Sequence, residues 1–170
     1  MSHGDFVSED ESENGAEEKF VIPMKAEDVM TREVITLDEN VSAKKAAEIM
    51  AQEGVSAIIV TAEGKAIGIL TERDILKRIV VEDKNSVETK LKDIMSSPLV
   101  TIGPSVDLEE AARIMFEKKI KNLPVINDNR LIGLINLQDI CRLQPEVLKM
   151  LRQLMVTPKN LQRVLKCYII

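Results

Sequence analysis

Aromatic residues are scarce in this chain of 170 residues, which has no Trp, one Tyr and three Phe. Proteins that bind single-stranded nucleic acid stack the bases on aromatic side chains, and nucleic-acid binders in general carry a strongly basic face. This chain instead has a net charge of −5. We therefore do not expect nucleic acid as a partner.

Histidine and cysteine are almost as rare, with one His near the N-terminus and two Cys, Cys141 and Cys167, far from each other. A tetrahedral zinc site, a Ser-His-Asp or Cys-His catalytic arrangement and a disulfide framework all lack the residues they need. The glycine-rich loops that cradle phosphates in nucleotide-dependent enzymes are also missing. The sequence predicts a protein that is not an enzyme and has no metal or resident cofactor.

Long hydrophobic runs are absent as well. A membrane-spanning helix needs about 18 or more consecutive apolar residues, and no stretch of the sequence reaches that length. The N-terminus is acidic, whereas a secretory signal begins with basic residues before an apolar core. We expect a cytoplasmic protein without a membrane partner, and the 45% of apolar residues suffices for a buried core.

The negative charge is concentrated in residues 1–19, where seven acids are opposed only by Lys19. The rest of the chain carries a net charge of +1, and residues 146–170 carry +4. Residues 1–19 have too few apolar side chains to offset the entropy lost on ordering. We expect them to form a disordered acidic tail.

The chain repeats itself with an offset of 65 residues. The matching pairs include Asp28 and Asp93, Met30 and Met95, Thr36 and Thr101, Ala46 and Ala111, Gly68 and Gly133, and Asp74 and Asp139. Such self-similarity indicates two copies of one supersecondary unit. We place the copies at residues 20–84 and 85–145, with a C-terminal helical extension over 146–170.

Each copy has a pattern typical of the order β-α-β-β-α. Apolar and β-branched residues predict first strands at 34–36 and 99–101, and Ser42 and Asp107 each precede a helix with an apolar face. The remaining features are a left-handed helix end at Gly54, two hairpins with turns at 62–65 and 127–130, closing helices from Thr71 and Asn136, and short helices over 146–155 and 159–168. The fold class is α/β (α+β), with small sheets partly covered by helices.

The segments Gly68–Asp74 and Gly133–Asp139 each run from a strand into a helix. The glycine permits close backbone approach, and a hydroxyl or amide side chain then opens the helix with a carboxylate three residues later. The first turn of a helix exposes unpaired N–H groups and suits an anion such as a phosphate. The same pattern also fits a plain helix cap, and the residues alone leave both interpretations open.

Over residues 24–145 the chain resembles a tandem pair of CBS domains, also called a Bateman module. The residues that carry the resemblance are the Asp-[Val/Ile]-Met starts at Asp28 and Asp93, Thr36, Thr101, Leu123-Pro124-Val125, and the segments Gly68–Asp74 and Gly133–Asp139. The resemblance implies two units packed pseudo-symmetrically through their small sheets. It also implies a regulatory module that binds AMP, ADP, ATP or adenosylmethionine in clefts between the repeats.

The resemblance assigns roles to particular positions. In such modules the hydroxyl at Thr71 contacts phosphate or ribose, the carboxylate at Asp74 holds the ribose hydroxyls, and strand backbone holds the base. The candidate ligand-binding residues are Thr36, Ser56, Ala57, Ile58, Thr71, Arg73, Asp74, Thr101, Lys121, Asn122, Leu123, Pro124, Asn136 and Asp139. The second copy departs from the family pattern at Asn136 and at Lys121-Asn122, so we expect the first copy to be the better site.

Two functions remain open at this stage. In one, the chain senses an adenosyl ligand and signals to an effector protein. In the other, it is a dimeric adaptor with vestigial clefts, in which Thr71 and Asp74 serve only as caps. Because modules of this family pair into a flat disc, we expect a homodimer in both cases.

Overall fold

The structure is a computed structural model that describes residues 24–143, 147 and 149. Its elements, in chain order, are α1 (Ala26–Val29), β1 (Thr36–Asp38), α2 (Ala43–Glu53), β2 (Ala57–Ala62), β3 (Lys65–Thr71), α3 (Glu72–Ile75), the π-helical segment η1 (Leu76–Val80), α4 (Leu91–Ile94), α5 (Leu108–Lys118), β4 (Asn122–Asn127), β5 (Arg130–Asn136) and α6 (Leu137–Leu143). The tail predicted at 1–19 and most of the helical extension predicted over 146–170 lie outside the described residues. Across the described part of the chain, no helix has the length and apolar character needed to cross a membrane.

The two repeats form sheets of different size. The first has the order β1-β2-β3, with β1 parallel and β3 antiparallel to β2, and the second is the antiparallel pair β4-β5. In place of the strand predicted at 99–101, the second repeat has a single parallel bridge between Ile102 and Val125. Two prolines explain the difference: Ile59 donates its N–H to the Ile35 carbonyl and Glu39 to the Thr61 carbonyl, but the matching residues, Pro124 and Pro104, have no N–H to donate.

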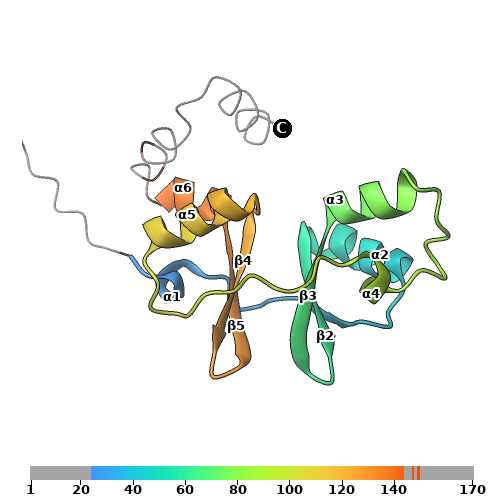
Figure 1. The fold of residues 1–170 in the computed structure, drawn as a ribbon, viewed down its shortest axis with the longest axis horizontal. Coiled ribbons are helices and arrows are strands. Elements are labelled where there is room, and N and C mark those ends of the chain that lie inside the picture. Colours follow the sequence, from blue (N-terminus) through green and yellow to red (C-terminus); the bar gives the residue numbers. More distant parts are fainter. Residues whose placement is uncertain (1–23, 144–146, 148, 150–170) are drawn as a thin grey trace, which may run out of the picture.

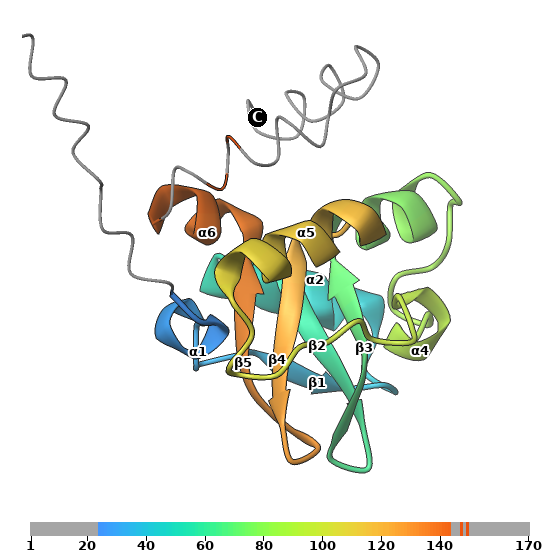
Figure 2. The same cartoon turned by 60° about the vertical axis from the view of Figure 1, so that its left-hand side comes forward.

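Both hairpins turn as the sequence predicts. Glu63 and Gly64 have φ of 50° and 76°, and Asp128 and Asn129 have φ of 47° and 61°. Two consecutive residues with positive φ are the mark of the tight turn that matches the twist of a two-stranded ribbon. The two turns lie at one end of the molecule, and α3 and α6 follow their strands at the other end (Figures 1 and 2).

The predicted starts of the two longer helices are confirmed, but only Ser42 makes a side-chain cap, and Asp107 precedes α5 without a side-chain cap hydrogen bond. The Ser42 hydroxyl accepts a hydrogen bond from the Lys45 N–H at 3.3 Å, and Gly54 ends α2 with a φ of 66°. Ala43, Ala46 and Met50 are buried, so the predicted face of α2 is the one that packs. Asp107 likewise precedes α5, whose Leu108 and Met115 are buried.

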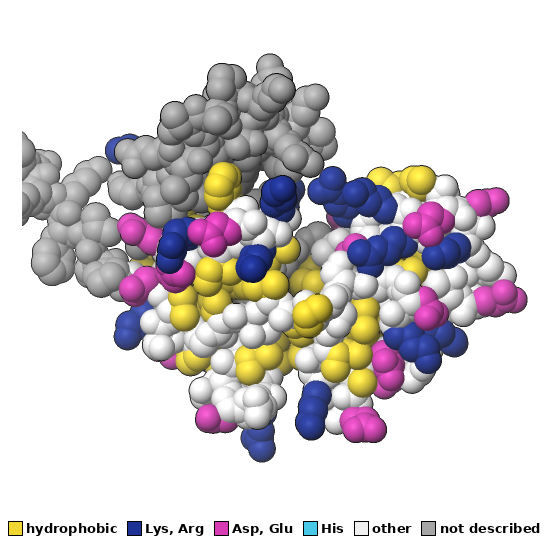
Figure 3. All heavy atoms as spheres, viewed as in Figure 1, with side chains coloured by type: hydrophobic (Ala, Val, Ile, Leu, Met, Phe, Trp, Pro, Cys, Tyr) yellow, Lys and Arg dark blue, Asp and Glu magenta, His cyan; other side chains and the backbone are white. Residues whose placement is uncertain are grey.

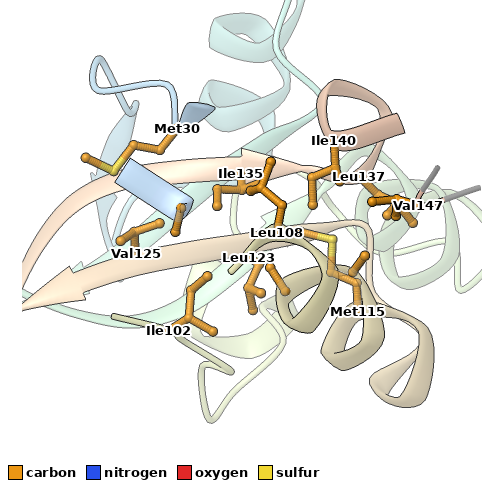
Figure 4. Close-up of a cluster of buried hydrophobic side chains, with 13 residues drawn as sticks. Met30, Ile102, Leu108, Met115, Leu123, Val125, Ile135, Leu137, Ile140 and Val147 are labelled. Carbon is orange, nitrogen blue, oxygen red and sulfur yellow. The ribbon is translucent and has the colours of Figure 1, made fainter. Parts of the chain in front are cut away.

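The buried side chains form two clusters, one for each repeat. The repeats exchange their short first helices, so that α4 packs in the first cluster and α1 in the second. The first cluster comes from one continuous stretch, residues 35–95, and includes Leu91 and Ile94 of α4. The second cluster combines residues 24–30 with residues 100–147 and includes Ala26 and Met30 (Figure 4). Val147, in the predicted extension, is buried in the second cluster.

The repeats meet through their sheets, since β3 contacts β5. This confirms the predicted arrangement of two small α/β units joined through their sheets. Bridges reinforce the junction, because Ile69 of β3 pairs with Ser96, and Leu134 of β5 pairs with Thr31. Each strand therefore bonds to the segment that follows the exchanged helix.

Candidate functional site

The two polar motifs lie at the same end of the inter-repeat junction. Glu72 donates its N–H to the Ser56 carbonyl at 3.2 Å, and Leu137 donates its N–H to the Lys121 carbonyl at 2.8 Å. Thr71 pairs with Ala57 across the first sheet, and Asn136 pairs with Asn122 across the second. The structure thus brings the predicted residues of each motif together at the point where the sheet passes into a helix (Figure 2).

In the first copy, Thr71 and Asp74 form a complete capping box. Asp74 donates its N–H to the Thr71 hydroxyl at 3.3 Å, and the Asp74 Oδ2 accepts from the Thr71 N–H at 3.0 Å and from its hydroxyl at 2.6 Å. This reciprocal bonding satisfies donors that the first turn of a helix leaves unpaired. The cap interpretation of this motif is confirmed, and a ligand-binding role for the same residues stays a prediction.

Sequence reasoning missed two residues at this motif, Ser96 and Arg78. The Ser96 hydroxyl donates to Oδ1 of Asp74 at 3.4 Å, and the Arg78 guanidinium forms an ion pair with the same oxygen at 3.4 Å. The spacing of four residues between Asp74 and Arg78 is a recognised signal for an ion pair on a helix. Nothing in the sequence around Ser96 points to Asp74, because the contact depends on how the repeats exchange α4.

The second copy is built differently. Asn136 accepts a hydrogen bond from the Gln138 N–H at 2.8 Å and donates to the Asn122 side chain at 2.9 Å. Asp139 therefore takes no part in a capping box, and it lies 4.0 Å from Arg142. A shallow hollow of about 280 Å³ opens beside it, lined by Val29, Thr31, Asp139, Arg142 and Leu143.

The remaining predicted residues are spread over the molecule. Thr36 lines a separate cleft of about 360 Å³ beside the hairpin turns, together with Arg32, Thr61 and Arg130 (Figure 3). The side chains of Ile58 and Leu123 are fully buried in the two clusters, and Pro124 is buried too, so a ligand would meet only their backbone. Arg73 and Thr101 are exposed.

Positive side chains gather around α3 (Figure 3). Arg73 and Lys77 are exposed on the helix that follows the first motif, and Lys118 and Lys119 are exposed at the end of α5. Within the described residues there is no group of three or more His, Cys, Asp or Glu placed to hold a metal ion. The charge of this region suits an anionic ligand.

The protein is a tandem-repeat module. Its two small α/β units meet through their sheets, and each has a polar motif where a strand enters a helix. The CBS domain family profile matches residues 26–81 and 91–146. The chain therefore belongs to the CBS domain family, with two CBS domains in tandem.

Several curated proteins are similar in sequence to this chain. The chain is 35% identical over 113 residues to the CBS domain-containing protein YhcV of Bacillus subtilis, a match that covers 66% of this chain and 80% of that protein. It is 38% identical over 120 residues to an uncharacterized protein of Methanopyrus kandleri, a match that covers 69% of this chain and 61% of that protein. The chain thus spans less than two thirds of the length of the second relative.

Solved structures share the fold. The hexameric CBS-CP12 protein from bloom-forming cyanobacteria superposes with a TM-score of 0.67 at 26% identity and covers 71% of this chain and 72% of its own. The CBS-domain containing protein ATU1752 of Agrobacterium tumefaciens gives a TM-score of 0.62 at 26% identity, over 66% and 90% of the two chains. The recognition of the family from the sequence is confirmed.

An enzyme is also among the relatives. The inosine-5′-monophosphate dehydrogenase of Methanocaldococcus jannaschii is 35% identical over 120 residues, which cover 69% of this chain but only 23% of the enzyme. The shared part is the accessory CBS pair. CBS pairs are generally regulatory, ligand-sensing modules and are usually not catalytic.

Proposed function

We propose that this chain binds an adenine nucleotide or adenosyl compound between its repeats, acts in the cytoplasm as a homodimer, and passes the ligand state to an effector protein. The observation that carries the proposal is that each candidate carboxylate lies beside a segment of the other repeat. Ser96 contacts Asp74, and Thr31 and Asp139 line one hollow. A ligand held by either carboxylate would touch both repeats and report on how they sit together.

The chemistry of an adenosyl ligand fits this setting. A ribose offers two neighbouring hydroxyl donors, which one carboxylate can accept, and its phosphates suit the exposed Lys and Arg side chains near α3. The aliphatic and backbone surroundings of Ala57 and Pro124 can hold a base without aromatic stacking. The scarcity of aromatic residues is therefore compatible with adenine binding.

The fully occupied capping box supports the alternative, a dimeric adaptor with vestigial clefts, since Asp74 has a structural task without any ligand. The exposed apolar side chains of Leu76 and Val80 on η1, and of Val81 directly after it, offer a surface for another chain in either case. The two functions differ in whether an adenosyl ligand binds at all.

A thermal-shift panel of AMP, ADP, ATP and adenosylmethionine tests the proposal. A ligand present at about 100 times its dissociation constant adds about 2.7 kcal/mol to the free energy of unfolding, which raises the melting temperature by several degrees. Calorimetry on wild type, Asp74→Asn and Asp139→Asn then assigns the sites. The absence of any shift with all four compounds would favour the adaptor.

A further inference from the structure

The guanidinium of Arg78 joins the first motif to the start of the second repeat. Its Nη1 donates to the carbonyl oxygens of Ile94 and Met95, at 2.5 and 2.6 Å. These carbonyls lie at the C-terminal end of α4, where a helix leaves acceptors without partners and favours a positive charge. Arg78 therefore holds α4 of the second repeat against the helical segment of the first.

The other nitrogen of the guanidinium completes the coordination of Asp74. Nη2 lies 3.2 Å from the Ser96 hydroxyl and 3.4 Å from Oδ1 of Asp74. With Ser96 on Oδ1 and two donors from Thr71 on Oδ2, the carboxylate faces four donors. An ionised carboxylate has about four lone-pair sites, so Asp74 has no free acceptor for a ribose. Its side chain is also only 14% exposed.

The second repeat lacks this arrangement. The residue 65 positions after Arg78 is Leu143, which is half exposed and has no charge. Asp139 is 42% exposed, and among the described residues its one ion pair is the 4.0 Å contact with Arg142. The hollow beside Asp139 is lined by Val29, Thr31 and Leu143, which match Ile94, Ser96 and Arg78 in the repeat. The two carboxylates therefore differ in availability even though their motifs align.

We infer that Arg78 is a latch that closes the first ligand site and couples it to the second repeat. The inference rests on the proposed nucleotide-binding function and specifies its regulation. A ligand that takes Asp74 must displace Arg78, and displacement also frees the Ile94 and Met95 carbonyls and loosens α4. The second site has no latch and binds first, which reverses the ranking expected from the motif sequences alone.

Thermodynamic linkage explains both the lower affinity of the first site and its coupling to the second repeat. A group that stabilises the closed state lowers the apparent affinity of any ligand that requires the open state. Because coupling is reciprocal, a ligand on Asp74 must weaken the contact between Arg78 and α4 by the same factor. Through Arg78, ligand binding at the first site therefore changes the contacts of residues 94–96, near the start of the other repeat.

Paired substitutions test the latch by titration calorimetry with AMP and with ATP. Arg78→Met removes the charge and the guanidinium donors and keeps an unbranched apolar side chain. In an Asp139→Asn background the first site dominates binding. There we expect Arg78→Met to raise the affinity for the nucleotide by about tenfold, because the guanidinium no longer competes with the ligand for Asp74. The reciprocal variant, Leu143→Arg in an Asp74→Asn background, should weaken the second site by about tenfold, because it places a guanidinium beside Asp139 and the end of α1.

Hydrogen exchange supplies a second readout, which does not rely on measured affinities. In the wild-type protein the Met95 N–H donates to Leu91 within α4 at 2.7 Å. Saturating ligand should accelerate exchange of this amide severalfold, and Arg78→Met should do so without ligand. A protected amide in both experiments would overturn the latch, and so would binding with affinities that both substitutions leave unchanged.

The outcomes separate the latch from the proposed function. If the nucleotides bind and Arg78→Met leaves the first site unaltered, only the latch fails. If Asp139→Asn binds weakly and the double variant with Arg78→Met and Asp139→Asn binds about tenfold more tightly, both stand. If no variant, including Arg78→Met, binds AMP or ATP, nucleotide binding and its regulation by Arg78 fail together.

Discussion

Met30, which follows α1 in the first repeat, lies directly against Gly133 in β5 of the second. A Cβ placed on Gly133 would overlap Sδ of Met30 and come within 2.9 Å of its Cβ. The matching pair in the other half is Met95 against Gly68, where an added Cβ would overlap Sδ and approach Cγ to 3.0 Å. The sequence predicts that both glycines permit close approach of a neighbouring segment, and in the structure the nearest atoms at each glycine belong to a methionine side chain.

Alanine at these two positions should destabilise the protein to different degrees. Gly133→Ala conflicts with the Cβ of Met30, which moves only with its backbone, so we expect a loss of about 1–3 kcal/mol in the free energy of unfolding. Gly68→Ala should cost less, because its two nearest contacts are with the flexible Met95 side chain and the nearest backbone atom, the Ser96 carbonyl oxygen, lies at 3.2 Å. Urea unfolding measures both, and Gly103→Ala is the control, since no heavy atom lies within 4 Å of its added Cβ. Equal losses at Gly103 and Gly133 would contradict this explanation.

Asp74→Asn should lower stability as well as ligand affinity. The substitution removes the charged partner of Arg78 and weakens the capping box, which together should cost about 1–2 kcal/mol. Asp139→Asn, on a half-exposed carboxylate outside any capping box, should change stability by less than about 0.5 kcal/mol. Urea unfolding of the two variants side by side checks the contrast, and a larger effect at Asp139 would refute it.

The proposed homodimer should depend on the exposed apolar face of η1. Sedimentation at micromolar concentration should give about twice the chain mass of 19.0 kDa. Val80→Glu places a charge on that face and should shift the protein toward the monomer. Val87→Glu is a matched control, because Val87 is similarly exposed but lies outside η1. If wild type sediments as a monomer, the homodimer is wrong.

Fragments should differ in their ability to fold, because only the first cluster is continuous in sequence. A fragment of residues 33–98 contains every member of that cluster, and we expect cooperative thermal unfolding by circular dichroism. A fragment of residues 97–170 lacks Ala26 and Met30, both buried in the second cluster, and should remain unfolded. Adding a peptide of residues 20–32 should restore structure to it. The repeat boundaries predicted at 84/85 and 145/146 stay a prediction that this experiment also examines.

Local chemistry explains how much of the fold was predictable. Ser42, Gly54 and the residues of both hairpin turns act on their own neighbours, so the sequence pattern identifies the elements they begin or end. The failure of a strand to form at 99–101 was also readable in principle, because Pro104 cannot donate the bond that Glu39 donates.

Long-range contacts explain what was not predictable. The pattern Asp-[Val/Ile]-Met marks the short helices α1 and α4, but an apolar helical face does not say which sheet it will meet. The role of Ser96 depends on that exchange, and so does the reach of Arg78 to the Ile94 carbonyl. Arg73 was a candidate through the resemblance, yet the arginine that contacts Asp74 is one helical turn further along.

In the sequence, the first cluster lies between the two segments that form the second cluster, and this order has a mechanical consequence. α1 contacts β5, and α6 follows β5 directly, so both ends of the described core are fastened to the second cluster. Tension applied between residues 24 and 143 would pass through that cluster by the short route from α1 to α6. The stretch 35–95 lies outside this route. It would therefore carry no force until the contact between Met30 and Gly133 breaks. In any tethered assembly, the first candidate site would thus be shielded from pulling forces that act on the second candidate site.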